Sequence, residues 1–297
     1  MSIQYQERWV SRDSIQIWTE SFGNIQDPAV ILVIGAGAIS TSYSDDFCGE
    51  IANAGYFVLR YDQRDYGKST KFPQIQSEAL SDPELLKKEL PYRIEDLVED
   101  LRVIMDDYGI SKAHIVGHSM GGMITQLFTA KHPKRLLSFT SISVAPASPK
   151  CEIEPIPKET QEKLYANIPS GNFEQDVDGW LASYKILNGT MEFDIDQARE
   201  YVREIYERDP HANVAWSHIG VQCLLPDYLN QFKNNRVPGL ILHGEEDPLQ
   251  PVSYAAAVHE MIKNTKLTIL PRLGHMFFNR EAQKLILSHL LEHFALN

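Results

Sequence analysis

The stretch Ala113–Gly122 reads AHIVGHSMGG, and the helical pattern MITQLFTAKHP follows it directly. Its apolar start predicts a buried strand, so a strand leads through a glycine-rich turn into a helix. The turn contains the pattern Gly-x-Ser-x-Gly, in which Ser119 stands between Gly117 and Gly121. Such a turn strains the backbone of the serine and exposes its hydroxyl at the end of the sheet. Only glycine fits on both sides, because it has no Cβ. We therefore predict that Ser119 is a nucleophile.

This five-residue pattern alone has low specificity, because a glycine-lined turn with a solvated serine looks the same. The strand before it, the helix after it and the additional Gly122 favour the catalytic interpretation. The backbone N–H of Met120, at the start of the helix, would then point at a developing oxyanion. The second donor should come from the loop after the first buried parallel strand, and we expect the N–H of Ala36 to provide it.

In a site built on this turn, an acid and then a histidine follow the serine along the chain. The stretch PGLILHGEEDPLQP, which starts at Pro238, contains a buried strand followed by Asp247. An acid at the C-terminal end of such a strand lies at the ligand-binding edge of the sheet. Glu245 and Glu246 compete for the role, and a turn or N-cap aspartate is the structural alternative. The proline after Asp247 favours this acid, because it stiffens the turn that directs the carboxylate.

The predicted base is His275, which follows a short strand in the stretch LPRLGHMFF and precedes the final helix. A lone histidine is most often structural or solvated, but His275 is the only one of the ten histidines that follows the acid at such a junction. We expect His275 to take the proton of Ser119 and return it to the leaving group. Asp247 would hold the imidazole in the right tautomer and stabilise its cation.

Apolar runs and helical patterns alternate along most of the chain. Runs typical of buried strands cover Ala29–Ile34, Phe57–Tyr61, Ala113–Val116, Leu136–Val144 and Gly239–His243. Helical patterns cover Asp45–Ala54, Arg93–Tyr108, Met120–His132, Ser253–Ile262 and Arg280–Phe294. This alternation predicts an α/β protein with a mostly parallel twisted sheet flanked by helices. At the N-terminus, the period-two stretches Ile3–Val10 and Ile15–Phe22 predict a hairpin.

The alternation stops between Pro146 and Asn235, where the sequence has helical spacing but no convincing buried strand. The helical patterns there are Glu159–Asn167, Asp176–Leu187, Asp196–Glu207 and Val214–Cys223. We therefore predict a core domain of residues 1–145 and 236–297 and a helical cap of residues 146–235 laid over the sheet. The irregular segment Lys71–Pro91 is long for a connection between a strand and a helix, and such loops are usually functional or mobile.

Composition excludes several classes of protein. The formal net charge of −12 repels phosphate backbones, so we expect no nucleic-acid partner. The chain has no run of about 18 uncharged apolar residues, and its start lacks the pattern of a signal peptide, so we expect no membrane partner. Three distant cysteines without a CxxC pair favour reduced thiols and a cytoplasmic location. No HExxH motif or ligand spacing indicates a metal, and we expect no cofactor.

One competing signal is a partial dinucleotide fingerprint. Val33–Ser40 reads VIGAGAIS, and Asp62 ends the next strand near the spacing at which an acid would bind a ribose. Ser40, however, stands where the third glycine belongs, and the following TSYSDDF predicts a helix that starts only after a cap near Ser44. An oxidoreductase would also leave the serine, acid and histidine unexplained, so this alternative is the weaker one.

Taken together, GHSMGG, LHGEEDPLQP and LGHMFF resemble the α/β-hydrolase superfamily over nearly the whole chain. The stretch RYDQRDYGKST is similar to the Asp-x-Arg-Gly-x-Gly-x-Ser turn of many members, with Asp65 where glycine is usual. With the VIGAGA loop in place of His-Gly-x-Pro, this detail is similar to the aclacinomycin methylesterase type of esterase. The resemblance implies that Asp62 and Arg64 are structural. The missing His-Gly-x-Pro and the serine nucleophile argue against haloalkane dehalogenases and epoxide hydrolases, which use an aspartate.

The hypothesis is a serine hydrolase that cleaves a small-molecule carboxylic ester, such as a methyl ester of a medium-sized apolar compound, through an acyl-enzyme. Carbon–carbon bond hydrolysis, lactone opening, amide cleavage and cofactor-free perhydrolysis use the same triad, and the fold also serves ligand sensing without turnover. These alternatives stay open, as does the oligomeric state. The candidates for the substrate pocket are Gly35, Gly37, His118, Trp180, Tyr184, Trp216, His218 and Met276. Aromatic residues at helical spacing also fit simple packing.

Overall fold

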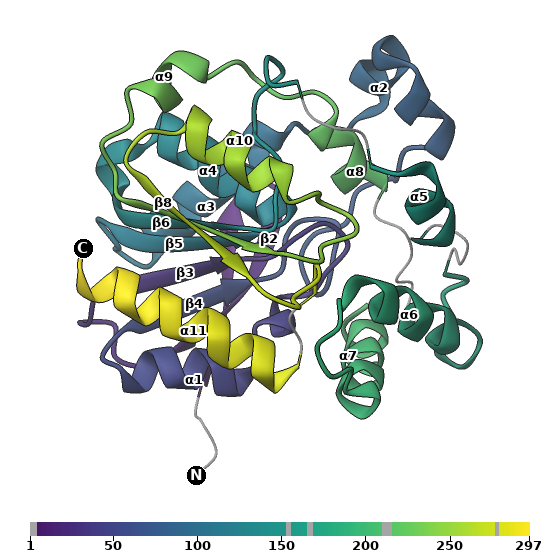
Figure 1. The fold of residues 1–297 in the computed structure, drawn as a ribbon, viewed down its shortest axis with the longest axis horizontal. Helices are drawn as coiled ribbons and strands as arrows, with labels where there is room; N and C mark the ends of the chain where they lie inside the picture. Colours follow the sequence, from purple (N-terminus) through teal and green to yellow (C-terminus); the bar gives the residue numbers. More distant parts are fainter. Residues whose placement is uncertain (1–4, 153–155, 165–168, 210–215, 277–278) are drawn as a thin grey trace.

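A computed structural model describes residues 5–152, 156–164, 169–209, 216–276 and 279–297 (Figure 1). The predicted segments that reach Ile3, Asn167 and Val214 lie partly outside these ranges. Elsewhere the predicted strands and helices are confirmed to within a few residues at their ends.

An eight-stranded sheet forms the centre of the molecule, in the order β1-β2-β4-β3-β5-β6-β7-β8. The strands are β1 (Tyr5–Arg12), β2 (Ile15–Phe22), β3 (Ala29–Val33), β4 (Phe57–Tyr61), β5 (Ala113–His118), β6 (Leu136–Ile142), β7 (Gly239–Gly244) and β8 (Thr265–Leu270). The N-terminal hairpin pairs antiparallel, and β2 also pairs antiparallel with β4. All pairs from β4 to β8 are parallel. The predicted mostly parallel sheet is therefore confirmed.

Helices cover both faces of the sheet, which explains why its central strands are continuous apolar runs. In Figure 1, α1 (Asp45–Asn53) and α11 (Arg280–Ala295) lie on one face, and α3 (Ile94–Asp107), α4 (Met120–Lys131) and α10 (Ser253–Met261) lie on the other. One buried apolar cluster forms on each face. Every residue of β3, β4, β5 and β7 is buried between these two layers.

The strand order changes direction at β3. The chain leaves β3 for β4 on one side and later returns through β5 on the other side. In a parallel sheet, the loops that follow two such strands diverge and leave a crevice at the carboxyl ends of the strands. The loop Gly35–Gly37 follows β3, and Ser119 follows β5. The topology therefore brings the predicted oxyanion loop and the predicted nucleophile to the same crevice.

Among the residues described between β6 and β7, five helices replace the strand–helix alternation. They are α5 (Lys158–Leu164), α6 (Phe173–Leu187), α7 (Ile195–Arg208), α8 (Trp216–Gln222) and α9 (Leu229–Lys233). In Figure 1, α6 and α7 form a pair beside one end of the sheet, as a cap would. By contrast, α8 and α9 contribute Val221 and Phe232 to the core cluster on the α4 face.

The segment Lys71–Pro91, predicted as an irregular connection, contains two short helices, η2 (Ser77–Ser81) and α2 (Pro83–Glu89). The carboxylate of Asp82 accepts the N–H groups of the first turn of α2, and Pro83 stands where a proline costs no hydrogen bond. This pair was a helix start signal that the sequence interpretation overlooked. The segment packs on α8, because a Cβ on Gly220 would lie 3.0 Å from side-chain atoms of Ile75, Leu86 and Leu90.

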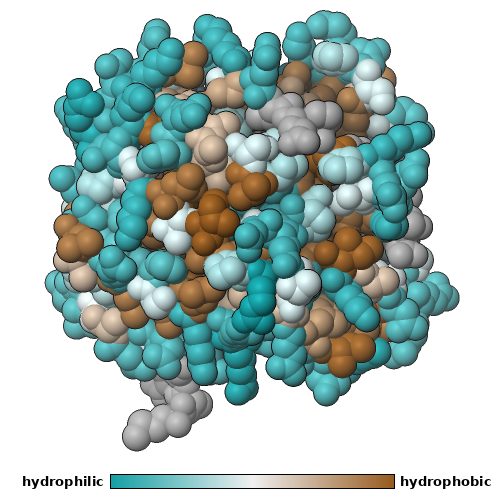
Figure 2. Space-filling view, in the orientation of Figure 1, coloured by the Kyte–Doolittle hydropathy of each residue, from teal (hydrophilic) through white to brown (hydrophobic). Residues whose placement is uncertain are grey.

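The visible surface is mostly hydrophilic. Hydrophilic residues dominate the face shown in Figure 2, and hydrophobic residues form scattered patches among them. Exposed apolar surface of this kind is normal for a folded domain, because polar atoms alone cannot cover it. None of the described helices combines the length and the apolar character needed to cross a bilayer.

Candidate active site

Ser119 lies in the turn between β5 and α4 and has backbone angles of φ 54° and ψ −126°. A positive φ is strained in a residue with a Cβ, typically by about 1–3 kcal/mol, and persists only where the surroundings enforce it. The neighbouring residues of the motif are buried, whereas Ser119 is partly exposed. The turn therefore presents the hydroxyl group, as the sequence predicts.

Three glycines make this turn possible by allowing backbone segments to meet. A Cβ on Gly117 would come within 3.0 Å of the carbonyl oxygen of Gly121, and a Cβ on Gly121 would come equally close to the carbonyl oxygen of Val33. A Cβ on Gly122 would collide with the side chain of Val144. The start of α4 is thus held against both neighbouring strand ends, and no larger residue fits at the three positions.

The predicted acid and base are hydrogen-bonded to each other. Nδ1 of His275 lies 2.8 Å from Oδ2 of Asp247, and Oδ1 of Asp247 accepts the N–H groups of Leu249 and Gln250 at 2.9 Å and 2.8 Å. Burial by itself raises the pKa of Asp247, but the facing His275 and these hydrogen bonds bring it below its ordinary value. An ionised Asp247 therefore fixes the tautomer of His275 with the proton on Nδ1, which leaves Nε2 free to accept one.

The two competing acids have other surroundings. The carboxylate of Glu246 accepts the N–H and the hydroxyl of Thr190 at 2.7 Å and 3.0 Å. Glu245 is exposed to solvent. Asp247 is therefore the acid that the structure brings to His275.

His118 connects the nucleophile turn with the histidine loop. Its Nε2 lies 2.8 Å from the backbone oxygen of His275, and the two rings lie 4.8 Å apart. Burial lowers the pKa of His118 to about 3, so the ring is neutral and its Nε2–H donates to that carbonyl. Because Ser119 is the next residue, the predicted nucleophile and the predicted base lie at the same end of the sheet.

Among the described residues, Ser119 Oγ makes no hydrogen bond to the ring of His275. Catalytic hydrogen bonds of this kind are often long before a substrate binds and tighten in the complex. His118, which precedes Ser119 in the sequence, is thus hydrogen-bonded to the backbone of His275, whereas Asp247 is hydrogen-bonded to the ring of His275.

The predicted oxyanion donors have unused N–H groups. No described residue accepts a hydrogen bond from the backbone N–H of Met120 or of Ala36. The N–H of the neighbouring Gly37 is already used, because it donates to Nδ1 of His218 at 3.2 Å. Within this loop, the N–H of Ala36 therefore fits the predicted role of second oxyanion donor better than the N–H of Gly37 does.

His218, a predicted pocket residue, connects three parts of the molecule. It belongs to α8 and is completely buried. Its Nε2 donates to the carbonyl of Arg64 at 2.6 Å, while its Nδ1 accepts the N–H of Gly37. Burial lowers the pKa of His218, so a neutral ring is expected. The side chain holds together the loops that follow β3 and β4, which makes it a support of the predicted oxyanion loop.

The loop after β4 has the structural roles that the family resemblance implies. The carboxylate of Asp62 accepts the N–H groups of Ser40 and Lys68 at 2.8 Å and 3.0 Å. The guanidinium of Arg64 binds both oxygens of Asp100 at 2.7 Å and 2.6 Å. Both side chains tie the loop to its surroundings without an evident part in the chemistry.

Asp65, which replaces the usual glycine of this turn, has a φ of 71°. Aspartate tolerates this left-handed region better than most residues. Its carboxylate accepts the N–H of Phe72 at 2.5 Å and the hydroxyl of Tyr92 at 2.6 Å. These two bonds anchor the segment that leads to η2 and account for aspartate at this position.

The remaining pocket candidates divide between two apolar clusters. The cap cluster joins α6 and α7 to the core, and its buried members are Ile39, Tyr66, Val177, Leu181, Tyr184, Ala198, Tyr201, Val202, Ile205 and Tyr206. Trp180 and Met276 pack against this cluster, whereas Trp216 packs against the core cluster on the α4 face. Gly35 lies against the nucleophile, since a Cβ there would be 3.0 Å from Cβ of Ser119. The cap cluster thus packs side chains of α6 and α7 against Met276, the residue after the predicted base.

A network of charged side chains joins the end of α7 to the sheet. Arg208, at the end of α7, lies 2.6 Å from Glu20 and 3.2 Å from Asp62, both completely buried. Glu20 also pairs with the buried Arg60 at 2.6 Å, and Arg60 pairs with Asp45. No local motif marks Arg208, so the sequence interpretation did not predict this role.

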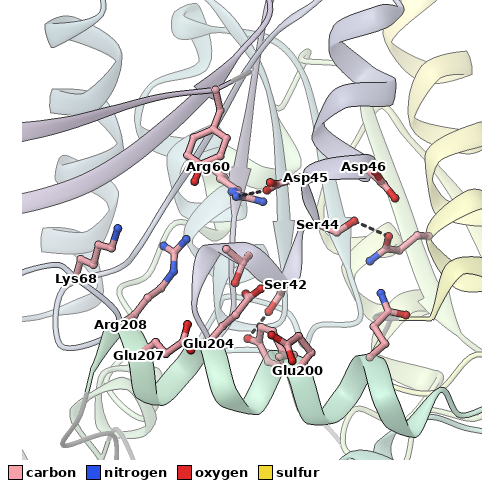
Figure 3. Close-up of a pocket in the computed structure, with 15 residues that line it drawn as sticks. Ser42, Ser44, Asp45, Asp46, Arg60, Lys68, Glu200, Glu204, Glu207 and Arg208 are labelled. Atoms are coloured by element: carbon pink, nitrogen blue, oxygen red, sulfur yellow. Dashed lines mark hydrogen bonds and ion pairs between the residues drawn. The ribbon is translucent and has the colours of Figure 1, made fainter. Parts of the chain in front are cut away.

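A polar cavity of about 570 Å³ lies over this network (Figure 3). Helix α7 faces it with Glu200, Glu204 and Glu207, and burial raises the pKa of Glu204. None of the predicted catalytic residues lines this cavity. Arg60 and Arg208 line it but are already ion-paired with core carboxylates. The cavity is therefore separate from the candidate active site.

Comparison with known proteins gives a consistent result. The family described as alpha/beta hydrolase fold matches residues 28–281. Rhodomycin D methylesterase DauP from Streptomyces sp. (strain C5) is 25% identical over 289 residues, which cover 90% of this chain and 91% of that protein. Rhodomycin D methylesterase DnrP from Streptomyces peucetius is 24% identical over 287 residues, with the same coverage of 90% and 91%.

Among solved structures, 2-hydroxy-6-oxo-6-phenylhexa-2,4-dienoate hydrolase from Rhodococcus sp. strain RHA1 superposes with a TM-score of 0.75. It is 20% identical, and the match covers 99% of both chains. An esterase from Exiguobacterium antarcticum has a TM-score of 0.74 at 16% identity, covering 98% of this chain and 100% of that one. At these identities the structural likeness shows the fold alone.

Proposed function

The chain belongs to the alpha/beta hydrolase fold family, and from this premise we propose that it is a serine hydrolase that cleaves carboxylic esters. Ser119 is the nucleophile, His275 the general base and acid, and Asp247 the residue that orients the histidine. The observation that carries the proposal is the hydrogen bond of 2.8 Å between His275 and Asp247 at the sheet end where Ser119 is held at a φ of 54°.

The first half of the reaction forms an acyl-enzyme. Nε2 of His275 takes the proton of Ser119 while Oγ attacks the ester carbonyl. The carbonyl oxygen becomes an oxyanion and accepts hydrogen bonds from the N–H groups of Met120 and Ala36. The tetrahedral intermediate then breaks its bond to the alkoxy oxygen, which leaves as an alcohol with the proton from His275.

The second half releases the acid. His275 removes a proton from a water molecule, and the resulting hydroxide attacks the acyl carbon. The same two N–H groups stabilise the second oxyanion. The intermediate collapses, Ser119 Oγ recovers the proton from His275, and the carboxylic acid departs. The net reaction consumes one water and produces one acid and one alcohol. Asp247 stays ionised throughout and stabilises the imidazolium in both halves.

The cap cluster and the two methylesterase relatives support a class of substrate. The cap cluster is apolar and aromatic, which favours a medium-sized apolar acyl group over a charged one. Two relatives that match over nine tenths of the chain are named as methylesterases. We therefore propose a methyl ester of such a compound as the substrate. The three cysteines are free thiols, which fits the reducing, cytoplasmic location that we propose.

The test compares two serines that follow neighbouring strands. Ser119→Ala removes the proposed nucleophile, while Ser143→Ala changes a serine that follows β6 and also has a positive φ, of 48°. We expect Ser119→Ala to lower the turnover of a p-nitrophenyl ester by about 10³-fold or more. It should also abolish labelling by a fluorophosphonate. Ser143→Ala should keep the label and at least half of the rate.

Circular dichroism of both variants should match the unchanged protein, so that lost activity is not lost folding. If Ser119→Ala hydrolyses the ester at a near-normal rate, the proposed mechanism is wrong. Mapping of the labelled peptide gives an independent answer, because the label should sit on Ser119 before any natural substrate is known.

A further inference from the structure

A short segment of the cap is bonded to the backbone of the histidine loop. We call this contact the junction and define it as residues 187–191, at the end of α6, with residues 272–276. The carbonyl of Leu187 accepts the N–H groups of His275 and Met276 at 2.6 Å and 3.0 Å, and the carbonyl of Asn188 accepts the N–H of Gly274 at 3.1 Å. The carbonyl of Arg272 in turn accepts N–H groups of residues 190 and 191 at 3.1 Å and 3.3 Å.

Two glycines let these backbones approach. A Cβ on Gly189 would come within 3.0 Å of the carbonyl oxygen of Arg272, and a Cβ on Gly274 would come equally close to the carbonyl oxygen of Leu187. Gly189 also has a φ of 72°, which favours glycine. The segments touch through main-chain atoms, so a shift of one is transmitted directly to the other.

Side-chain hydrogen bonds also hold the junction in place. Asn188 is 2% exposed; its Nδ2 donates to the carbonyl of Met191 at 2.7 Å, and its Oδ1 accepts Nδ2 of Asn279 at 3.2 Å. Thr190 binds the carboxylate of Glu246 through its N–H and its hydroxyl, and Glu246 immediately precedes Asp247. The same cap segment is therefore tied to the loop of the base and to the loop of the acid.

The dipole of helix α6 adds an electrostatic contribution to this contact. The last carbonyls of a helix lack intrahelical partners and carry the negative end of the helix dipole. Helix α6 runs from Phe173 to Leu187, and its final carbonyl is the acceptor for the N–H of His275. A negative helix end stabilises a nearby imidazolium, the form that His275 must take during the reaction. The junction thus places the loop and favours the charge that develops on its histidine.

We propose that the segment Leu187–Met191 is a positioning element for His275, so that the docking of the cap sets the alignment of the catalytic base, with Asn188 and Gly189 as its positioning residues. The inference rests on the proposed function, because it takes His275 as the base. None of these side chains touches the substrate in the proposed mechanism. Their effect on the rate passes through His275, which separates them from residues that bind the ester.

The test uses the two ends of α6, which offer matched residues. Gly189→Ala places a methyl group against Arg272 and Gly274, whereas Gly171→Ala, before the other end, meets no atom within 4 Å; both glycines have a positive φ, of 72° and 86°. The backbone strain is therefore similar, and only the junction contact differs. Asn188→Ala and Asn172→Ala form a second pair, since Asn172 caps the N-terminus of α6 by accepting the N–H of Gln175. This second pair removes side-chain bonds without adding a collision.

We expect Gly189→Ala and Asn188→Ala to lower kcat for a p-nitrophenyl ester by about 10- to 100-fold with KM changed less than threefold. Gly171→Ala and Asn172→Ala should keep kcat within about twofold of the value of the unchanged protein. Urea unfolding of all four variants measures the loss of stability, which should be larger for Gly189→Ala and Asn188→Ala than for their controls, so kcat is compared without urea, where all four variants are folded.

A second readout is the ring of His275 in ¹⁵N-resolved NMR spectra, recorded in the Ser119→Ala background, where no turnover is needed. The Nδ1–H signal of the His275–Asp247 bond should shift or broaden in Asn188→Ala and Gly189→Ala and stay in place in the two controls. Equal spectra in all four variants would overturn the inference, as would equal kcat values within each pair. If Ser119→Ala keeps its activity, the proposed function fails while these spectra remain readable. If Gly189→Ala does not fold, the Asn188→Ala pair decides.

Discussion

The nucleophile turn and the junction both bring backbone segments together through glycines, but they rest on different supports. At the turn, Gly121 lies against Val33 and against Gly117, all within the buried centre of the sheet. At the junction, Gly189 of the cap segment lies against Arg272, which is exposed. The turn can loosen only if the core loosens, whereas the junction can also loosen when the cap moves. We infer that Ser119 is held by the global stability of the domain and that His275 is held by the local stability of the cap.

The largest effect is expected for Gly121→Ala, which tests whether the turn and the junction have separate supports. The new Cβ would collide with backbone atoms of Val33 and Ile34, which cannot move without disturbing β3. We expect the free energy of unfolding to fall by about 4 kcal/mol or more, measured by urea denaturation. Gly189→Ala should cost clearly less stability while still lowering kcat. If both substitutions cost the same stability, the turn and the junction share one support and the distinction is wrong.

The substitution Arg208→Ala tests how the cap is held at the end of α7, away from the junction. It leaves the carboxylates of Glu20 and Asp62 buried with fewer charge partners, and breaking such a pair typically costs about 3 kcal/mol. Arg203→Ala, on the same helix, removes a solvent-exposed pair with Glu200 and should stay within about 0.5 kcal/mol. Urea denaturation measures both.

The same pair of variants also tests whether the contacts between cap and core affect the alignment of His275. We expect kcat to fall in Arg208→Ala and to stay unchanged in Arg203→Ala. A destabilised Arg208→Ala with a normal kcat below its unfolding transition would show that the junction keeps its geometry without the α7 anchor.

The smallest expected effect concerns pH and His118, which lies between the two regions. Its folded pKa of about 3 is depressed from the ordinary 6.5, so the unfolded chain binds the proton more readily. Stability is therefore fully present above pH 6.5 and is lost as the pH falls from 6.5 toward 3. Between pH 7 and pH 5, His118 should account for about 2 kcal/mol of that loss.

His118→Gln tests this value, because glutamine has no such titration and can still donate to the carbonyl of His275. We expect the variant to lose less stability than the unchanged protein between pH 7 and pH 5, measured by urea denaturation at each pH. Equal losses in both proteins would contradict a buried neutral His118. His114, whose pKa burial lowers to about 4, remains in both proteins and provides a constant background.

Much of the fold was predictable because its signals are local. Continuous apolar runs gave the buried strands, and the helix starts followed from caps such as Ser44, which accepts the N–H of Phe47 as expected. That late helix start also supports the choice against a dinucleotide site. The error at Lys71–Pro91 came from ignoring Asp82 and Pro83, which are an equally local signal. The predicted domain limits remain a prediction, and the packing of α8 and α9 on the core bears on where the cap ends.

The candidate site was predictable where one motif contains both partners of a contact. Gly117, Ser119 and Gly121 lie within five residues, so a strained turn can be inferred from their identities alone. His218 shows the limit of this reasoning. It was predicted as a pocket residue because it is a bulky polar residue in the cap, but its two nitrogens bind Gly37 and Arg64, which are remote in the sequence.

By itself, the sequence determined the parallel sheet, the nucleophile turn and the order of serine, acid and histidine. These follow from side-chain periodicity and from steric limits that act between near neighbours along the chain. Only the tertiary structure decided that Asp247 rather than Glu246 faces His275, that Arg208 anchors the cap, and that Leu187 and Asn188 hold the histidine loop. The physical reason is that backbone carbonyls and buried charges choose partners by position in space, and every residue carries the same carbonyl whatever its side chain.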